Sequence, residues 1–229
     1  MSTGGSEVIV CGLNVVDILL PRLDDAAPDE KHAVPWILVS GGGPAGNAAG
    51  MLAGPRYWTS FVARVSSTEA MGIVARSELA RWGVDLRMLI DDAPAIPAIA
   101  VVQVHPQTGA RTVFYCVEGY RYLTDDDVAN VRFEGARLML CDGYERGAES
   151  MLRRAMAHGM HRVTDLEAGD PATLRRLIEL STDAILPLQA ARLLSGETAV
   201  ESAVARLSSC TSGRVIVTDG LAGSWTMGA

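Results

Sequence analysis

Short apolar segments recur along this chain, separated by stretches with helical periodicity, and this pattern constrains the fold more than any other feature. The later apolar segments lack polar alternation, as expected for strands buried on both faces of a parallel sheet. The predicted strands are Val8–Gly12, Trp36–Val39, Ile96–Val104, Thr112–Val117, Leu138–Cys141, Ala184–Leu186 and Val215–Thr218. The predicted helices are Glu69–Trp82, Glu145–His158, Pro171–Leu180 and Glu197–Leu207. Alternating strands and helices predict an α/β fold with a doubly wound, mainly parallel sheet flanked by helices.

Two regions, about 17–39 and 96–117, interrupt this alternation. In the second region, two strand-like segments flank His105-Pro-Gln-Thr-Gly109, a turn sequence typical of an antiparallel hairpin. We therefore expect these regions to form a small β flap, or lid, within a single domain covering residues 7–229. Residues 1–6 are small and polar, and we expect them to be disordered.

Composition excludes several classes of function. The chain has 229 residues, 48% of them hydrophobic, which is enough for one substantial core. Its formal net charge of −7, without any cluster of Arg or Lys, argues against a nucleic-acid partner. Lys31 is the only lysine, so the sequence has no Walker-type lysine and almost no candidate for a Schiff base.

The cysteines and the apolar segments indicate a cytoplasmic protein. The cysteines are Cys11, Cys116, Cys141 and Cys210; they are far apart and form no Cys-x-x-Cys pair. Three of them lie in apolar strand-like segments, which favours small buried hydrophobes in a reducing compartment. The first residues show neither the basic nor the apolar region of a signal peptide. No apolar stretch approaches the roughly 18 residues of a membrane span, so we expect no membrane partner.

The segment Ser40–Gly50 contains Gly41-x-Gly43-x-x-Gly46, the pattern of a dinucleotide fingerprint. That fingerprint should follow the first strand directly and be followed by an acidic residue at the end of a second strand. Here the glycines come well after the first strand, and the nearest downstream acid, Glu69, begins a predicted helix. Two interpretations of the glycines are therefore a nicotinamide site and a glycine turn that allows tight helix packing, and the neighbouring residues suggest a third.

That third interpretation comes from Gly42-Gly-Pro-Ala-Gly-Asn47-Ala-Ala, which resembles the first signature of the ribokinase-like (PfkB) carbohydrate kinases, Gly-Gly-x-x-x-Asn-x-Ala. Further segments resemble the family in the same order, from about Val8 to Trp225, with ketohexokinase- and fructokinase-type members the most similar. These segments are Gly12–Asp17, Trp82–Arg87, Thr108–Val113, Cys141–Tyr144, Asp165–Glu167, Leu193–Gly196 and Val215–Gly223.

The resemblance implies transfer of the ATP γ-phosphoryl group to a hydroxyl of a sugar, with a ketose such as fructose as one candidate and with Mg²⁺ as cofactor. It implies sugar contacts from Asp17, at the end of the first strand, and from Gly42, Gly43 and Asn47. Arg111 and Asp142 would lie beside the phosphates, and Thr218, Gly220 and Gly223 near the nucleotide. The family also implies a homodimer formed through the flap, and no residue is assigned as a metal ligand.

The sequence departs from the family in two places. Pro187-Leu-Gln-Ala190 stands where the family often has Asn-x-x-Glu, a motif associated with magnesium and phosphate. The second signature, Asp-Thr-x-Gly-Ala-Gly-Asp, whose last aspartate is the general base, is not found before Ala229. The resemblance therefore implies that the base lies beyond Ala229, that the C-terminal part of the fold is absent and that apolar surface is exposed on the last strand. A catalytically silent sugar- or nucleotide-binding protein is the alternative function.

Several polar residues remain open to two interpretations. Arg111 could instead be a solvated hairpin charge, and Asp29 or Glu30 could be either a second sugar carboxylate or part of a solvated loop. Glu167 could be a ligand, could lie near a metal or could be a surface residue. His158 and His161, three residues apart at a predicted helix end, are better explained by favourable charge at a helix C-terminus than by a metal site.

Overall fold

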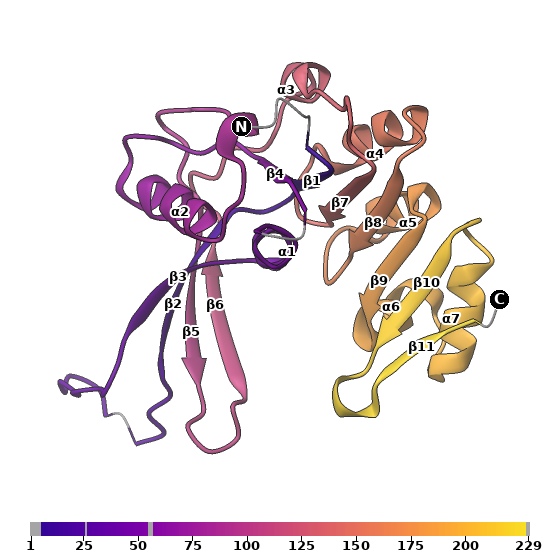
Figure 1. The fold of residues 1–229 in the computed structure, drawn as a ribbon. Helices are drawn as coiled ribbons and strands as arrows, with labels where there is room; N and C mark the ends of the chain where they lie inside the picture. The colour runs from indigo at the N-terminus through magenta and orange to yellow at the C-terminus, as the bar shows by residue number, and fades with distance from the viewer. Residues whose placement is uncertain (1–5, 26, 55–56, 228–229) are drawn as a thin grey trace.

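The computed structural model of the chain describes residues 6–25, 27–54 and 57–227. Within these residues the strands form two sheets (Figure 1). The main sheet has seven strands in the order β11-β10-β9-β8-β7-β1-β4, and the lid sheet has four in the order β3-β2-β5-β6. Residues 1–5 of the segment expected to be disordered lie outside the described residues, whereas Ser6 is buried.

The main sheet confirms the predicted doubly wound, mainly parallel architecture. Its neighbouring strands pair in parallel, except that β11 runs antiparallel to β10. The strands are β1 (Val8–Cys11), β4 (Thr59–Val62), β7 (Leu138–Asp142), β8 (His161–Asp165), β9 (Asp183–Pro187), β10 (Arg214–Thr218) and β11 (Ser224–Thr226).

Helices connect the parallel strands, and two short 3₁₀ segments complete the regular structure. They are α1 (Pro44–Leu52), α2 (Ala70–Arg81), α3 (Asp125–Asn130), α4 (Ala148–Ala157), α5 (Pro171–Leu180), α6 (Leu188–Ser195), α7 (Val200–Ser208), η1 (Leu86–Met88) and η2 (Gly220–Ala222). Side-chain caps fix some of their starts, as where the Asp170 carboxylate accepts the Thr173 amide hydrogen before α5. Among the described helices, none combines the length and apolar character that a bilayer crossing requires.

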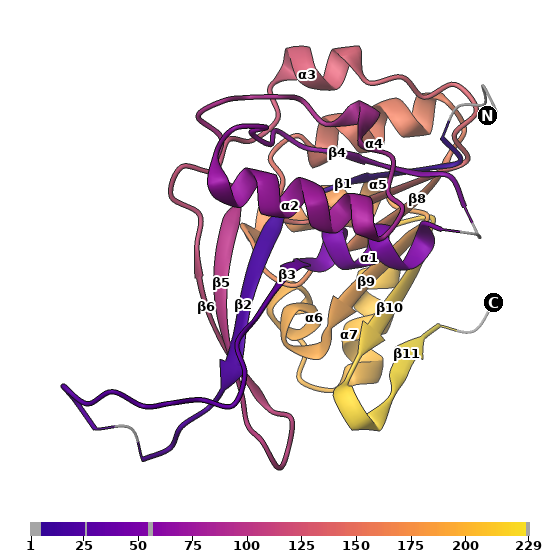
Figure 2. The ribbon, with the colours of Figure 1, turned by 60° about the vertical axis from the view of Figure 1, so that its left-hand side comes forward.

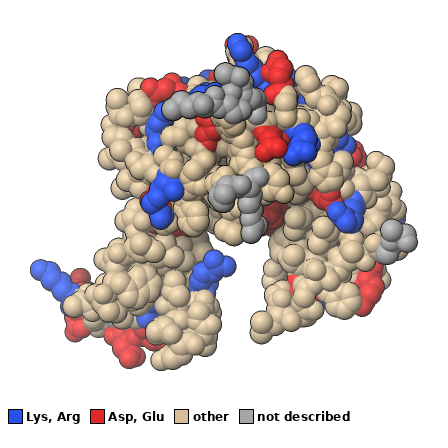
Figure 3. All heavy atoms as spheres, viewed as in Figure 1, with Lys and Arg blue, Asp and Glu red and all other residues tan. Residues whose placement is uncertain are grey.

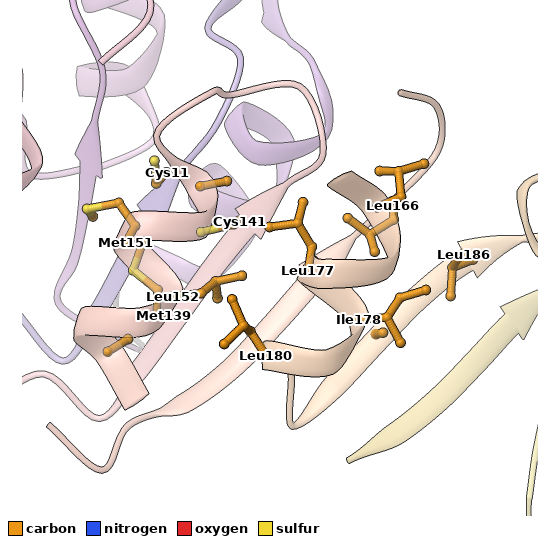
Figure 4. Close-up of a cluster of buried hydrophobic side chains, with 14 of the residues drawn as sticks. Cys11, Met139, Cys141, Met151, Leu152, Leu166, Leu177, Ile178, Leu180 and Leu186 are labelled. Carbon is orange, nitrogen blue, oxygen red and sulfur yellow. The ribbon is translucent and has the colours of Figure 1, made fainter. Parts of the chain in front are cut away.

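Alternation along β1 divides the core between the two faces of the main sheet. Ile9 and Cys11 pack with residues of α4 to α7 in the larger cluster, whereas Val8 and Val10 pack with α1 and α2 in a second cluster. Figure 4 shows side chains of the larger cluster, with Met151 and Leu177 among those between the helices and the strands. Cys11 and Cys141 are neighbours in this cluster, on adjacent strands, and both are free thiols, as expected for buried cysteines. Cys116, which was expected to be buried, is exposed because it ends an edge strand of the other sheet. With helices on both faces, all four residues of β1 are buried.

The lid sheet projects from the main body on the side of β1 (Figure 2). Its strands are β2 (Val15–Pro21), β3 (Leu38–Gly42), β5 (Ala98–Val104) and β6 (Arg111–Cys116). β5 and β6 form the antiparallel hairpin predicted around His105–Gly109. β2 pairs in parallel with β5 and antiparallel with β3. Val15, Ala98, Ala100 and Val102 pack against Leu13 and Tyr120, which defines the inner face of the lid.

Two sequence-based placements are corrected. Asp17 was expected at the end of the first strand, but that strand stops at Cys11, and Asp17 lies inside β2 because the chain turns at Gly12–Asn14 and enters the lid. His158 and His161 do not share a helix: His158 caps α4 and stacks on Phe133, while His161 begins β8 and pairs with Asp183. The polar composition of β8 hid this strand from the apolar pattern.

Replacing Gly12 tests whether close packing is required at the point where the chain leaves the main sheet. A Cβ at this position would overlap the Ala45 side chain and the Asp142 carboxylate, so we expect Gly12→Ala to lower the free energy of unfolding by about 2 kcal/mol. Gly46→Ala is the matched control, because a Cβ there meets no atom within 4 Å and alanine favours a helix by about 0.5–1 kcal/mol. Urea denaturation of the two variants measures both effects, and equal stabilities would contradict the close packing at Gly12.

Candidate functional site

The candidate site lies where the chain passes from the main sheet into the lid. The parallel strands of the main sheet end at one common edge, and β1 ends there at Cys11 before Gly12 and Leu13 lead into β2. Carboxyl ends of parallel strands are where open α/β sheets bind ligands. The lid sheet extends from this edge, so the side chains on its inner face lie next to the carboxyl ends of the parallel strands.

Asp17 and Gly42 meet at the base of the lid. β2 and β3 pair so that Val15 lies opposite Gly42 and Asp17 opposite Ser40, and a Cβ at Gly42 would overlap the Asp17 carboxylate. Asp17 is half-buried, and this burial raises the pKa of its carboxyl group, while the positive charge of Arg111 acts in the opposite direction. The carboxylate is therefore partly desolvated at a point where only a glycine leaves it room.

Arg111 lies on the same face of the lid as Asp17. Asp17 pairs with Ala100 of β5, and Arg111 pairs with Val104 of β5, four residues further along. Because side chains alternate between the faces of a sheet, positions an even number of residues apart share a face. The guanidinium group is exposed rather than paired in the described ion pairs, which leaves it available to an anion.

Gly43 and Asn47 belong to the start of α1. Gly43 has a φ of 79° in the left-handed region, and a Cβ there would come within 2.6 Å of the Val15 side chain. No side chain caps α1, and its first residue, Pro44, has no N–H, so the amides of Ala45 and Gly46 have no capping partner, while the Asn47 amide donates to the Gly43 carbonyl. Asn47 is exposed one turn into the helix. The structure thus brings Asp17, Gly42 and Gly43 together, with Asn47 close by.

This geometry decides how the glycine segment is interpreted. Gly41 and Gly42 belong to β3, an antiparallel strand of the lid, and not to the first strand of a parallel βαβ unit. A dinucleotide fingerprint requires the latter position, because its glycines must bring the pyrophosphate to the first helix of the parallel sheet. The segment instead joins the lid to α1, so the nicotinamide interpretation loses its structural basis.

Asp142 ends β7 and is completely buried. Its carboxylate accepts hydrogen bonds from the backbone amides of Leu13, Tyr144 and Glu145, with the Leu13 bond at 2.8 Å. Burial raises the pKa of Asp142 to about 6 despite these amides, which favour the ionised form. In this structure Asp142 therefore holds the start of the lid in place, and its carboxylate is turned toward the backbone rather than toward solvent.

Glu145 is a buried acid that sequence reasoning did not single out. It accepts hydrogen bonds from the amides of Leu123 and Gly147 and from the Tyr120 hydroxyl. Burial raises its pKa to about 7, and the nearby charge of Asp142 acts in the same direction. No sequence signal marks it, because a glutamate before a helix is usually solvated. Its position joins the segment after β6 to the end of β7, beneath the lid.

Thr218, Gly220 and Gly223 lie at the far side of the same edge. Thr218 ends β10, and the two glycines, with φ of 49° and 100°, form the turn to β11. β10 stands four strands from β1, a separation of roughly 20 Å at the usual strand spacing. Figure 3 shows an open notch between the lid and this C-terminal part. The structure therefore does not bring these residues into contact with Arg111 or Asp17.

The described residues contain no cluster of three or more His, Cys, Asp or Glu side chains that could hold a metal ion by themselves. A magnesium ion that arrives with phosphate groups needs only one or two protein carboxylates. Asp165, at the end of β8, fits this requirement: burial and the charge of Glu167 raise its pKa to about 6, so a nearby cation would stabilise its ionised form. Glu167 also accepts the Tyr144 hydroxyl hydrogen at 3.3 Å.

Comparison with solved structures identifies the fold. Similar structures include a provisionally named ribokinase from Agrobacterium tumefaciens (TM-score 0.81, 23% identity, covering 99% of this chain and 74% of that one). A second is a fructokinase from Vibrio cholerae O395 bound to fructose, ADP and potassium ion (TM-score 0.77, 18% identity, covering 99% of this chain and 74% of that one). A third is an Arabidopsis thaliana ribokinase complexed with ribose and ATP (TM-score 0.74, 19% identity, covering 97% of this chain and 74% of that one). The chain has the ribokinase-like fold. Neither the models of protein families nor the curated proteins gave a match.

The raised pKa of Glu145 makes a prediction about stability. As pH rises from the ordinary glutamate pKa of 4.5 to about 7, an unfolded chain ionises Glu145 while the folded chain keeps its proton. The Glu145 carboxyl group alone should therefore cost the folded state about 3 kcal/mol of stability over this window, and Asp142 and Asp165, whose pKa values are also raised, should add to the loss. Glu145→Gln, whose residue 145 cannot ionise, should lose about 3 kcal/mol less than the unmodified chain over the same window, as measured by urea denaturation at several pH values.

The exposed Glu179 of α5 supplies the control, since Glu179→Gln should leave the pH profile of the unmodified protein unchanged. Identical pH profiles for Glu145→Gln and the unmodified chain would contradict the assignment of this transition to Glu145.

Proposed function

We propose that this chain is a carbohydrate kinase of the PfkB family that binds a sugar and ATP at the edge of the main sheet beneath the lid. The observation that carries the proposal is the meeting of the Asp17 carboxylate, the Gly42–Gly43 backbone and the uncapped start of α1 at the base of the lid. The Asp17 carboxylate accepts hydrogen bonds and the backbone amides donate them, and a sugar needs both because each of its hydroxyl groups donates and accepts.

Each residue has a role in this proposal. Asp17 accepts hydrogen bonds from sugar hydroxyls, which are stronger because its carboxylate is partly desolvated. Gly42 and Gly43 let the sugar approach the backbone, and the Asn47 amide both donates and accepts. Arg111 faces the transferred phosphoryl group, and the start of α1 stabilises negative charge through its free amides. Asp142 acts indirectly, because it holds the Leu13 backbone from which the lid starts.

The nucleotide is proposed to bind at the open notch. Thr218, Gly220 and Gly223 would lie along the phosphates and the sugar of ATP, where glycines of positive φ allow close approach. Mg²⁺ would accompany ATP, with Asp165 as its protein carboxylate, and would neutralise the charge of the transferred group. The proposal assigns no general base, because the second signature, which carries the base in the family, is not found before Ala229.

A ketose such as fructose is the proposed acceptor, supported by the fructokinase from Vibrio cholerae, whose structure contains fructose and ADP. The Arabidopsis ribokinase, whose structure contains ribose and ATP, supports a pentose equally well on structural grounds. Both sugars therefore belong in the test. Sugar binding without phosphoryl transfer would favour the silent-binding alternative.

Replacing Asp17 tests the sugar site. We expect Asp17→Asn to weaken sugar binding by about 10- to 100-fold, because the loss of a charged acceptor typically costs about 1.5–3 kcal/mol. Isothermal titration calorimetry with fructose and with ribose measures the affinity, and thermal denaturation verifies folding. Asp24→Asn is the matched control, because Asp24 is an exposed lid carboxylate paired with Arg22. If both variants bind sugar like the unmodified chain, the assigned site is wrong.

We also propose that the lid forms a homodimer. β6 is an edge strand of the lid sheet whose residues are all exposed, including Val113, Phe114 and Tyr115. β3, at the other edge, exposes Leu38 and Val39. Such an edge strand exposes unpaired backbone N–H and C=O groups as well as apolar side chains. A second copy of the lid would cover the backbone groups and the apolar surface together.

Sedimentation velocity tests the dimer. We expect the unmodified chain to sediment as a dimer at micromolar concentration, and Phe114→Glu to shift it toward monomer because a carboxylate would be placed in an apolar interface. Leu221→Glu is the control, since Leu221 is a still more exposed apolar residue that lies in η2, far along the chain from the lid. A monomeric unmodified chain, or a dimer that Leu221→Glu also disrupts, would contradict a lid interface.

A further inference from the structure

A cavity of about 190 Å³ lies between α1 and α2, next to the segment that joins the lid to the core. One side consists of Gly46, Gly50 and Met51 on α1, and the other of Ala75, Leu79 and Trp82 on α2; Gly41, Gly42, Asn14, Asn47 and Glu78 complete it. The glycines create the space: a Cβ at Gly46 would meet no atom within 4 Å, and Gly50 lies against the Trp82 ring.

This cavity and Asp17 lie on opposite faces of β3. A Cβ at Gly42 would meet the Asp17 carboxylate, whereas a Cβ at the adjacent Gly41 would come within 3.0 Å of the Glu78 side chain. Adjacent residues of a strand point to opposite faces, so β3 separates Glu78 from Asp17. Gly42 and Asn47 border the cavity, but the Asp17 carboxylate, on which the proposed sugar site depends, does not. The cavity therefore adjoins the proposed sugar site but opens on the other face of β3.

Asn14 gives the cavity its polar character. The residue is 2% exposed. Within the described part of the chain, its Nδ2 is a buried side-chain atom without a hydrogen-bond partner. Leu13 and Val15, on either side of it, pack into the inner face of the lid, which leaves Asn14 directed the other way, toward the cavity that it lines. A buried amide without a partner is costly, so a ligand that supplies an acceptor there would recover that cost.

Glu78 supplies an acceptor on the facing helix. Its carboxylate receives the Gly41 amide hydrogen at 3.2 Å and a hydrogen bond from Arg81 at 2.6 Å, and the Arg81 contact holds the pKa of Glu78 below its usual value. The carboxylate is ionised near neutral pH and keeps lone pairs that can accept a further donor. Between Asn14 and Glu78 the walls are apolar, with the Trp82 ring as the largest surface.

We propose that this cavity binds a small, uncharged ring compound carrying a carbonyl acceptor and an N–H donor. The ring lies between the α1 glycines and the side chains of Leu79 and Trp82, the carbonyl accepts from Asn14 Nδ2, and the N–H donates to Glu78. The volume agrees with a single six-membered ring, since a dry engineered cavity of roughly 150 Å³ holds benzene. The site borders the proposed sugar site at Gly42 and Asn47, but its two hydrogen-bonding groups, Asn14 and Glu78, have no role in the sugar and nucleotide sites proposed above.

Benzamide is the probe, because it combines one ring, one carbonyl and one amide donor. Isothermal titration calorimetry with the full chain should show saturable binding of one benzamide per chain. Toluene, which has the ring alone and can make neither hydrogen bond, should bind about 100-fold more weakly, because each of the two hydrogen bonds contributes about 1.4 kcal/mol, or tenfold. Asn14→Leu should weaken benzamide binding by about tenfold and leave toluene binding unchanged. Absence of saturable benzamide binding, or equal binding of toluene and benzamide, would overturn the proposal.

Filling the cavity supplies the second measurement. Gly46→Leu should abolish benzamide binding because its side chain enters the open space, and Gly46→Ala should weaken it partially. Ala80→Leu is the matched control, because Ala80 is exposed on α2 and does not line the cavity, and it should bind benzamide like the unmodified chain. Thermal denaturation verifies folding, so unchanged binding by folded Gly46→Leu would show that benzamide binds elsewhere.

Asp17→Asn separates this proposal from the proposed function. It should abolish or weaken sugar binding but leave benzamide binding unchanged, because β3 lies between Asp17 and the cavity. Loss of benzamide binding in a folded Asp17→Asn chain would mean that the probe occupies the sugar site and would overturn the independent site. Failure of sugar binding alone leaves the benzamide result intact.

Discussion

The hydrogen bond from the Leu13 amide to the Asp142 carboxylate fixes the point at which the chain leaves the main sheet, and the lid depends on it. It joins the end of β1 to the end of β7, although the two residues are 129 positions apart. Gly12 fits beneath the same carboxylate because it has no Cβ. From this point β2 starts in a direction that brings Asp17 to the Gly42 backbone. A carboxylate that binds no ligand directly thus sets the position of the carboxylate proposed to bind the sugar.

The buried acids under the lid show a balance between burial and hydrogen bonding. Asp142 and Glu145 both have raised pKa values, since burial outweighs the backbone amides that favour their charged forms. No described arginine or histidine pairs with either of them. The backbone of the crossing segment takes the place of a cation, so these acids hold the chain in one conformation at the expense of stability above neutral pH.

The glycines from Gly41 to Gly50 have different surroundings on the two faces of β3. On one face of β3, Gly42 leaves room for Asp17; on the other, the α1 glycines open the cavity against Trp82. Glu78 fastens the same strand to α2 through the Gly41 amide. Of the glycines that a sequence pattern associates with phosphate binding, Gly41 and Gly43 are here required for close packing against Glu78 and Val15, whereas Gly46 borders open space in the cavity.

The sequence by itself determined the class of the fold, because apolar segments buried on both faces of a parallel sheet and the intervening helical periodicity are local properties. It also identified the β5–β6 hairpin from its turn residues and located the segment from Gly42 to Asn47. It did not reveal β8, whose polar side chains reach partners on neighbouring strands, or the roles of Asn14 and Glu145. The lid direction, the meeting of Asp17 with Gly42, and the separation of Arg111 from Thr218 were decided only by the tertiary structure. The reason is physical: burial, and with it the pKa of a carboxyl group or the cost of an unpaired amide, depends on residues distant in the chain, which no local pattern contains.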